Sequence, residues 1–197
     1  MNLPNKLTMF RIFITVIIVA LIGVNWSLLN ITWPIYLIGG KVVLRLNYLI
    51  AGGLFGVAAI TDMLDGQIAG KKDLVTDFGK TLDAIADKVL VNAVLIVLAY
   101  NRDITLVVPV IIISRDIIVD AIKSVSSAKG NVIGASQMGK IKTVFMMFGI
   151  TLALFENMPM EFFGIALDQL LILIATCLSI YSGIEYYLVN KELFNDK

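Results

Sequence analysis

Residues 62–87 read DMLDGQIAGKKDLVTDFGKTLDAIAD, and this stretch joins two apolar segments through a polar loop. Four of its aspartates stand where the apolar segments meet the loop: Asp62, Asp65, Asp83 and Asp87. A carboxylate at the end of a membrane helix needs a compensating positive charge, because a central membrane aspartate costs about 2.5–3.5 kcal/mol on insertion scales. The stretch therefore predicts a metal site where two helices meet.

The spacing of these residues places the carboxylates on two helix faces. Before the loop, four residues fall at i, i+3, i+4 and i+7: Asp62, Asp65, Gly66 and Ala69. After it, three residues fall at i, i+4 and i+8: Gly79, Asp83 and Asp87. The short loop between them, residues 70–78, makes the helices antiparallel neighbours and turns the two faces toward each other. An all-oxygen pocket of this kind suits hard divalent cations such as Mg²⁺ or Mn²⁺.

Two less specific interpretations apply to the same residues. The carboxylates could pair with neighbouring cations as a solvated loop face, namely with Lys71, Lys72, Lys80 or Lys88. That pairing explains one or two carboxylates but not their shared orientation. Gly66 and Gly79 could serve helix packing, whereas in a metal site their missing side chains let a ligand lie against the helix.

Composition indicates a membrane protein. The chain has 197 residues, of which 58% are hydrophobic, and its mean hydropathy is +0.89, so lipid must cover much of its apolar surface. Apolar runs of spanning length lie at about 7–29, 44–61, 81–100, 104–122, 141–155 and 164–189. We therefore expect an all-α, polytopic membrane protein with six transmembrane helices and a short interfacial segment at residues 2–8.

Several features refine this expectation. The first apolar run is expected to be a retained span, because no small-residue cleavage site follows it. No linker or repeat divides the chain, so residues 1–197 are expected to form one domain. Gly39-Gly40 predicts a turn. The chain has no histidine, so acid–base chemistry must fall to carboxylates, Lys or Tyr.

The basic residues predict the orientation in the membrane. With six spans, 13 of the 16 Lys and Arg residues fall on the side that holds both termini and the aspartates. The other side keeps Lys41, Arg45 and Arg102. Because basic residues favour the cytoplasmic side, both termini and the aspartate cluster are expected to be cytoplasmic, in the cell membrane.

The aspartate motif resembles the signature of the CDP-alcohol phosphotransferase family, D-x-x-D-G-x-x-A-R-x8-G-x3-D-x3-D. Every position matches except the arginine, which is Gly70 here. The resemblance implies a site for two Mg²⁺ or Mn²⁺ ions that bind the diphosphate of a CDP-activated lipid. Asp62, Asp65 and Asp83 would be the principal ligands, and Asp87 would be both a ligand and the general base that activates the acceptor hydroxyl.

The resemblance also implies contacts with the nucleotide. Gly66 and Ala69 would let the cytidine side approach closely, and Gly79 would lie against the bound CDP-lipid. Asn5, Thr8 and Arg11 resemble the start of the family's first span, near the nucleotide. In relatives the motif arginine would contact the diphosphate. Here Lys71 or Lys72 could reach the same phosphates as point charges, without the bidentate geometry of a guanidinium.

A second group of residues concerns the acceptor alcohol. Arg115 and Lys123 lie eight residues apart in the fourth apolar run, and Lys140 and Lys142 begin the fifth. Four cations beside a metal site favour a phosphorylated acceptor. Residues 114–116 and 139–143 resemble bacterial phosphatidylglycerophosphate synthases, whose acceptor is glycerol 3-phosphate. The alternative is snorkelling side chains with positive-inside bias, with Asp116 or Asp120 as the partner of Arg115.

The expected partners are CDP-diacylglycerol, glycerol 3-phosphate, membrane lipids and, because homodimers are usual in the family, a second copy of the chain. No nucleic-acid partner is expected. The nearest alternative function is the same reaction with inositol phosphate or serine as acceptor. A cation transporter, a metal-dependent prenyltransferase and an inactive homologue are further alternatives, the last because of Gly70.

Overall fold

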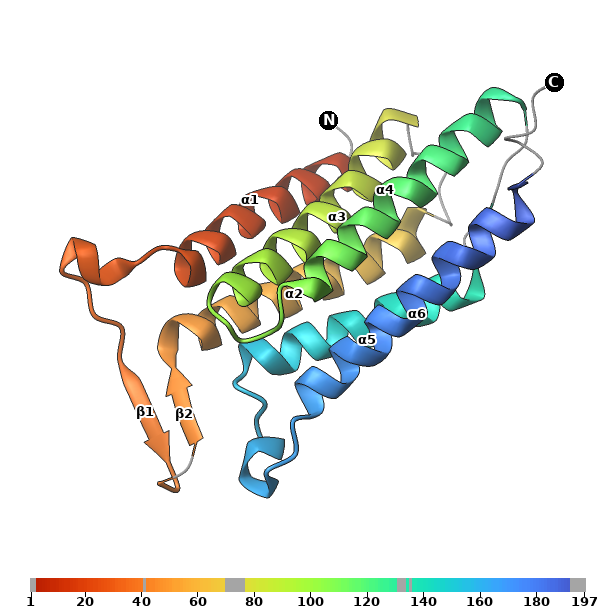
Figure 1. The fold of residues 1–197 in the computed structure, drawn as a ribbon. Helices are drawn as coiled ribbons and strands as arrows, with labels where there is room; N and C mark the ends of the chain where they lie inside the picture. Colours follow the sequence, from red (N-terminus) through yellow and green to blue (C-terminus); the bar gives the residue numbers. More distant parts are fainter. Residues whose placement is uncertain (1–2, 41, 70–76, 131–133, 135, 192–197) are drawn as a thin grey trace.

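The computed structural model describes residues 3–40, 42–69, 77–130, 134 and 136–191 of the chain. Six long helices form the body of the molecule (Figure 1). They are α1 (Leu3–Gly23), α2 (Leu46–Ala69), α3 (Asp77–Tyr100), α4 (Val107–Ala128), α5 (Gln137–Leu154) and α6 (Leu167–Val189). Each covers most of one predicted apolar run, so the expectation of an all-α fold with six helices is confirmed.

A small β-hairpin lies between α1 and α2, and the sequence did not predict its strands. It follows a short 3₁₀ helix, η1 (Trp26–Leu29), and pairs β1 (Ile35–Ile38) antiparallel with β2 (Val42–Arg45). Gly39 and Gly40 have φ values of +61° and +69°, a region that glycine adopts without steric strain. The predicted turn is therefore present at the tip of the hairpin.

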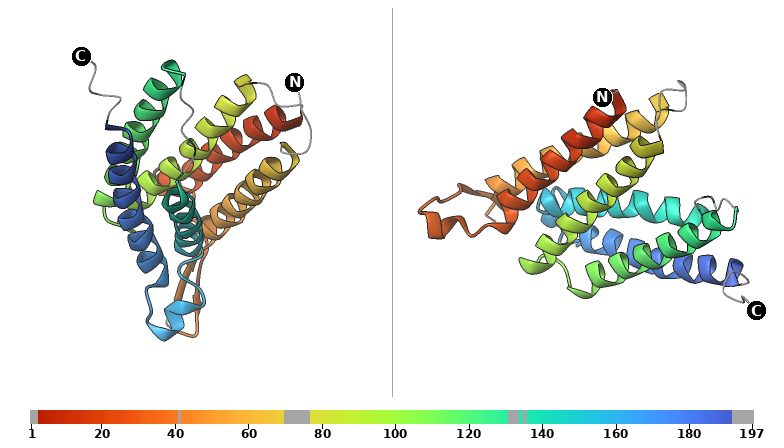
Figure 2. Two further views of the ribbon diagram at one scale, coloured as in Figure 1. Left: turned by 90° about the vertical axis from the view of Figure 1, so that its right-hand side faces the viewer. Right: turned by 90° about the horizontal axis from the view of Figure 1, so that it is seen from above.

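The helices pack around one apolar core and diverge toward one end. Helix α1 packs against α2 and α3, while α6 packs against α4 and α5. All six helices contribute to the core, which includes the fully buried Ile18, Phe55, Leu95, Ile112, Ile150 and Ala175. Figure 2 shows α4 and α6 separating from α1 and α2 toward the end where α1 begins and α6 ends.

A polar network closes the opposite end of the bundle. Nη2 of Arg45 lies 3.0 Å from Oδ1 of Asp103, and the same guanidinium pairs with Glu156 before α6. The Tyr48 hydroxyl donates to Oδ2 of Asp103 at 2.5 Å and accepts from Nδ2 of Asn101 at 2.7 Å. The hairpin, α2, the α3–α4 turn and the segment after α5 are thereby joined at one place.

Two of the described helices are long and apolar enough to cross a membrane on length and composition alone. The qualifying segments are Lys6–Gly23 in α1 and Leu167–Val189 in α6, and Leu46–Asp62 is a shorter apolar stretch. Helices α3 and α4 carry more charged residues, among them Asp83, Asp87, Arg115 and Lys123. The length and composition of the described helices therefore do not confirm six spans, and the polytopic arrangement stays a prediction.

Gly149 of α5 lies in close contact with α6. A Cβ atom built there would lie 2.7 Å from Cγ1 of Ile172 and 3.1 Å from its backbone nitrogen. We expect Gly149→Ala to lower the free energy of unfolding by about 1–3 kcal/mol, as overpacking does in a well-packed core. Thermal unfolding in detergent measures this change.

Gly53 is the matched control for Gly149. It also lies within a helix, α2, but an added Cβ atom there meets nothing within 4 Å. Gly53→Ala should leave the melting temperature unchanged or raise it slightly, since alanine favours a helix interior over glycine. Equal melting temperatures for the two variants would contradict the close packing of α5 on α6.

Candidate functional site

Arg11 of α1 lies among the predicted metal ligands. Its Nη2 is 2.9 Å from Oδ1 of Asp62, and its Nη1 is 2.9 Å from Oδ1 of both Asp83 and Asp87. The Arg11 side chain is fully buried, whereas the carboxylates of Asp62, Asp83 and Asp87 are 26%, 39% and 36% exposed. Helices α1, α2 and α3 therefore meet at one cluster of charge that solvent reaches from the carboxylate side.

Thr8 extends this cluster along α1. Its hydroxyl lies 3.3 Å from Oδ1 of Asp83, to which it donates, and only 2% of the residue is exposed. Thr8 and Arg11 are three residues apart, so both lie on the face of α1 that meets α3. The Thr15 hydroxyl donates to the Arg11 carbonyl at 2.8 Å. The first helix thus supplies hydrogen-bond donors to the carboxylates.

The charges of this cluster do not balance among the described residues. One guanidinium faces three carboxylates, which leaves an excess of negative charge. No group of three or more Asp, Glu or Cys side chains in the described part of the chain is arranged to hold a metal ion. Asp65, the fourth predicted ligand, has no described side chain and is not part of this comparison. The donor set itself is all oxygen, which is the set that hard divalent cations prefer.

The four predicted acceptor-binding cations line one cavity of about 310 Å³. They are Arg115, Lys123, Lys140 and Lys142, and they come from α4 and from the start of α5. Asp87 lines the same cavity. The cavity therefore connects the carboxylate cluster with the basic residues.

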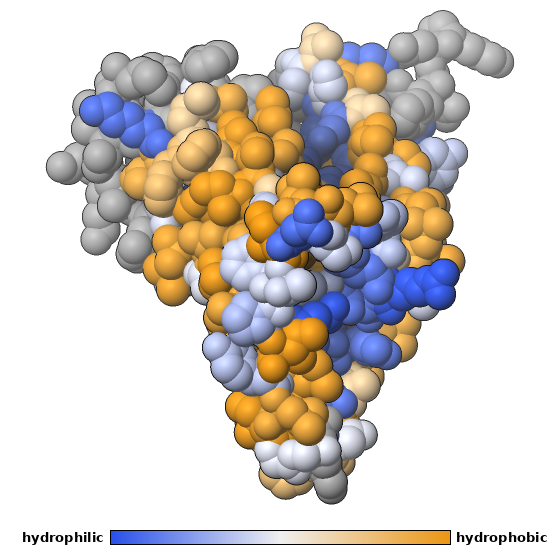
Figure 3. Space-filling model, turned by 90° about the vertical axis from the view of Figure 1, so that its left-hand side faces the viewer, coloured by the Kyte–Doolittle hydropathy of each residue, from blue (hydrophilic) through white to orange (hydrophobic). Residues whose placement is uncertain are grey.

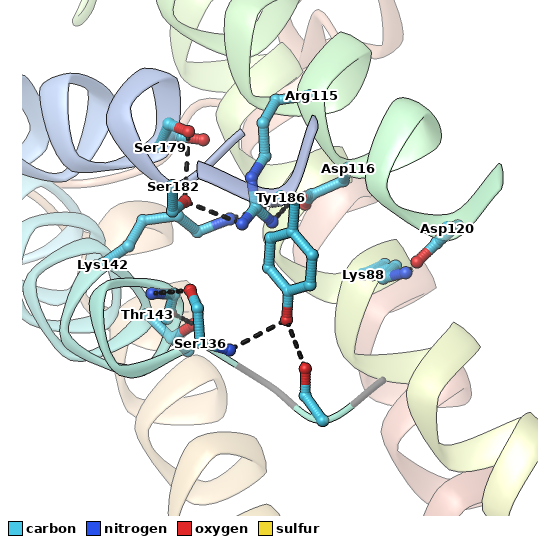
Figure 4. A network of polar contacts seen from close by, with 12 residues as sticks. Lys88, Arg115, Asp116, Asp120, Ser136, Lys142, Thr143, Ser179, Ser182 and Tyr186 are labelled. Carbon is cyan, nitrogen blue, oxygen red and sulfur yellow. Dashed lines mark hydrogen bonds and ion pairs between the residues drawn. The ribbon is translucent and has the colours of Figure 1, made fainter. Parts of the chain in front are cut away.

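Asp116 holds two of these cations in place (Figure 4). Its Oδ1 accepts a hydrogen bond from Nη1 of Arg115 at 3.0 Å and another from Nζ of Lys142 at 3.1 Å. Lys142 is only 7% exposed. Of the two acids considered as partners of Arg115, Asp116 is therefore the one that pairs with it. Asp120 instead forms an ion pair with Lys88.

The comparison with known proteins identifies the family. A profile described as CDP-alcohol phosphatidyltransferase matches residues 1–181. The chain belongs to the CDP-alcohol phosphatidyltransferase family. Three similar proteins are named CDP-diacylglycerol–glycerol-3-phosphate 3-phosphatidyltransferase, and each aligns over most of its own length and of this chain.

The protein from Bacillus subtilis is 35% identical over 193 residues, which cover 97% of this chain and 96% of the relative. The protein from Mycoplasma genitalium is 36% identical over 198 residues, covering 94% and 82%. The protein from Rickettsia typhi is 30% identical over 194 residues, covering 98% and 99%. The similarity to CDP-alcohol phosphatidyltransferases thus extends well beyond the aspartate motif.

Several predicted residues of the CDP-alcohol phosphatidyltransferase site have no described side chain. Asn5 lies in α1, and Asp65, Gly66 and Ala69 lie in α2, but their side-chain surroundings are outside the described part. Lys71 and Lys72, which follow Gly70 in the motif, lie outside it entirely. Gly79 is buried in the first turn of α3. The roles of these residues stay predictions.

Arg11 makes contacts that the sequence did not predict. The sequence placed it near the nucleotide, and lysines were considered as partners of the carboxylates. In the structure the guanidinium of Arg11 pairs with three carboxylates, and Lys88 pairs with Asp120. The available signal was an arginine three residues after Thr8 in an otherwise apolar run, because such a charge requires a partner.

Proposed function

We propose that the protein transfers the phosphatidyl group of CDP-diacylglycerol to glycerol 3-phosphate, giving phosphatidylglycerophosphate and CMP. The observation that carries the proposal is the shared cavity, in which the four predicted cations line one space together with Lys88, Asp87 and Asp116. A phosphorylated acceptor held by those cations would lie beside a carboxylate able to accept its hydroxyl proton. The names of the three relatives agree with this reaction.

In this proposal Asp87 is the general base. It takes the proton from the acceptor hydroxyl, whose oxygen then attacks the phosphorus joined to diacylglycerol. The bond from that phosphorus to the oxygen of CMP breaks, and CMP leaves with the electron pair. Arg115, Lys123, Lys140 and Lys142 bind the phosphate of the acceptor and orient its free hydroxyl toward Asp87.

We propose that the carboxylate cluster holds two divalent cations, Mg²⁺ or Mn²⁺. The supporting observation is that three carboxylates converge on one positive charge and still leave negative charge uncompensated. Asp62, Asp65, Asp83 and Asp87 would hold the ions. Bound there, the ions would offset charge on the phosphoryl oxygens and on the leaving group.

The nucleotide end of CDP-diacylglycerol is assigned to α1, α2, the loop after α2 and the first turn of α3. Asn5, Thr8, Gly66, Ala69, Lys71 and Gly79 are the proposed contacts. Thr8 supports this assignment, because its hydroxyl is bonded to Asp83 and therefore lies at the carboxylate cluster. Lys71 would supply a positive charge that Gly70 does not, in place of the family arginine.

We place the protein in the cell membrane with six spans, as a homodimer, and with both termini and the site on the cytoplasmic side. Helix α1 begins and α6 ends at the same end of the bundle (Figure 1). Large apolar side chains are exposed on the helices, such as Phe13 of α1 and Phe148 of α5, both 63% exposed. Figure 3 shows apolar residues over wide areas of one face of the molecule. Lipid would cover surface of this kind.

An acceptor assay tests the proposed function. Purified protein in detergent receives CDP-diacylglycerol and one radiolabelled acceptor at a time: glycerol 3-phosphate, serine or inositol phosphate. We expect CMP release with glycerol 3-phosphate, because the four predicted cations and Lys88 line the cavity. Release of CMP only with serine or inositol phosphate would assign a different acceptor.

Substituting one cation of the cavity tests whether the cavity binds the acceptor. Lys142→Gln should raise KM for glycerol 3-phosphate about tenfold or more, since a hydrogen bond to a charged group contributes about 1.5–3 kcal/mol. Lys129→Gln is the control, because Lys129 is exposed beyond α4 and does not line the cavity. Equal KM values for both variants would remove Lys142 from the acceptor site.

A further inference from the structure

Tyr186 of α6 lines the cation cavity but was not among the predicted site residues. It is 5% exposed. Figure 4 shows its ring among the basic residues and its hydroxyl directed at the segment that leads into α5. Helix α6 contributes no cation to the cavity lining. Its contribution to the lining is the side chain of Tyr186.

The hydroxyl of Tyr186 fixes the backbone before α5. It donates to the Gly134 carbonyl at 2.7 Å and accepts from the Ser136 backbone nitrogen at 2.8 Å. Ser136 is the N-cap of α5, where its side-chain oxygen accepts from the Gly139 nitrogen at 3.1 Å. This connection therefore sets where α5 begins, and Lys140 lies one residue beyond Gly139.

The ring of Tyr186 lies beside the two cations of α4. The Arg115 guanidinium carbon is 5.6 Å from the ring centroid, and Nζ of Lys123 is 5.4 Å from it. Both distances are within the range of cation–π attraction. One aromatic ring thus restrains two like charges that would otherwise repel each other.

Two neighbours of Tyr186 in α6 also contact Arg115. Ser182, four residues before Tyr186 and on the same helix face, accepts a hydrogen bond from Nη2 of Arg115 at 2.7 Å. Gly183 lets the arginine stem approach, since a Cβ atom there would lie 3.0 Å from Cγ of Arg115. Helix α6 therefore acts as the surface against which Arg115 is positioned.

We propose that Tyr186 is a positioning residue of the acceptor site, which holds the cations of α4 and of α5 around a single phosphate. This inference rests on the proposed function. The hydroxyl fixes the start of α5 with Lys140 and Lys142, and the ring fixes Arg115 and Lys123. Losing either part lets the cations separate, so the acceptor phosphate binds more weakly while CDP-diacylglycerol, bound at the carboxylates, is unaffected.

Two substitutions separate the two parts of the side chain. Tyr186→Phe keeps the ring and removes the hydroxyl, whereas Tyr186→Leu removes both. We expect Tyr186→Phe to raise KM for glycerol 3-phosphate about three- to tenfold, as loss of buried hydrogen bonds implies. Tyr186→Leu should raise this KM further, because cation–π attraction is lost as well. In Tyr186→Phe, kcat and the KM for CDP-diacylglycerol should stay within about twofold of wild type.

Tyr181→Phe is the matched control. Tyr181 lies on the same helix, is 58% exposed and does not line the cavity, so all three constants should equal those of wild type. A direct binding measurement accompanies the kinetics, with inorganic phosphate as a probe of the cations alone. Phosphate should raise the melting temperature of wild type and Tyr181→Phe more than that of Tyr186→Leu.

The outcomes distinguish this inference from the proposed function. Wild-type turnover with glycerol 3-phosphate tests the proposed function by itself. If wild type uses another acceptor, the KM for that acceptor is compared between wild type and the Tyr186 variants. The rise in melting temperature with inorganic phosphate is compared between the same proteins whichever acceptor is used. An unchanged acceptor KM in Tyr186→Phe and Tyr186→Leu, or a lower kcat with both KM values unchanged, would overturn the positioning role.

Discussion

Asp87→Asn should abolish CMP release while the protein remains folded. Asparagine has nearly the shape of aspartate, but its amide cannot accept a proton from the acceptor hydroxyl. Loss of a general base lowers a rate by about 10²–10⁴-fold, and the lost negative charge would weaken metal binding in addition. CMP release under saturating substrates measures the effect, and circular dichroism with thermal unfolding checks the fold.

The control for this prediction removes a carboxylate charge at the other end of the molecule. Glu161 is exposed and lies in the short 3₁₀ helix η2 (Met160–Phe163) before α6. Glu161→Gln should turn over at the wild-type rate. Unchanged turnover in Asp87→Asn would remove the proposed base, and a large loss of melting temperature in that variant would assign Asp87 to stability instead.

Arg11→Met should make the stability of the protein depend on divalent cations. Arg11 is the buried positive charge that faces Asp62, Asp83 and Asp87 at 2.9 Å each. Without it the carboxylates repel each other, and no other described side chain forms an ion pair with all three. Breaking a buried ion pair costs about 3–5 kcal/mol, and we expect the lower end because the carboxylates are partly exposed.

The measurement compares melting temperatures in EDTA and in millimolar Mg²⁺ or Mn²⁺. Arg11→Met should melt well below wild type in EDTA and recover much of the difference with divalent cations, whereas wild type should shift less. Arg102→Met is the control, because Arg102 is an exposed arginine after α3, at the far end of the bundle. If divalent cations leave the deficit of Arg11→Met unchanged, the carboxylate cluster is not a metal site.

The sequence predicted the helices well because each apolar run is long and is interrupted by recognisable turns. The sixth run was expected at 164–189, and α6 spans Leu167–Val189. The strands of the hairpin were missed for a physical reason. All four residues of β1 are exposed, so β1 lacks the alternation of buried and exposed residues that marks a half-buried strand.

The candidate site was predictable where it depended on spacing within one helix or across a short loop. The i, i+4 spacing of Asp83 and Asp87 predicted a shared face, and both carboxylates do lie at one guanidinium. Contacts between distant helices were not predictable. Arg11 and Asp83 are 72 residues apart, and periodicity shows which residues share a face but not which faces meet. The place of Tyr186 beside the segment before α5 was missed for the same reason.

The buried guanidinium also bears on how the protein is made. In small zinc proteins the ion is required for folding, so the amount of folded protein follows the supply of metal. Here a counter-charge to the carboxylates of two other helices belongs to the chain itself. We therefore expect the amount of folded protein in a cell to depend less on the supply of divalent cations than the proposed transferase activity does.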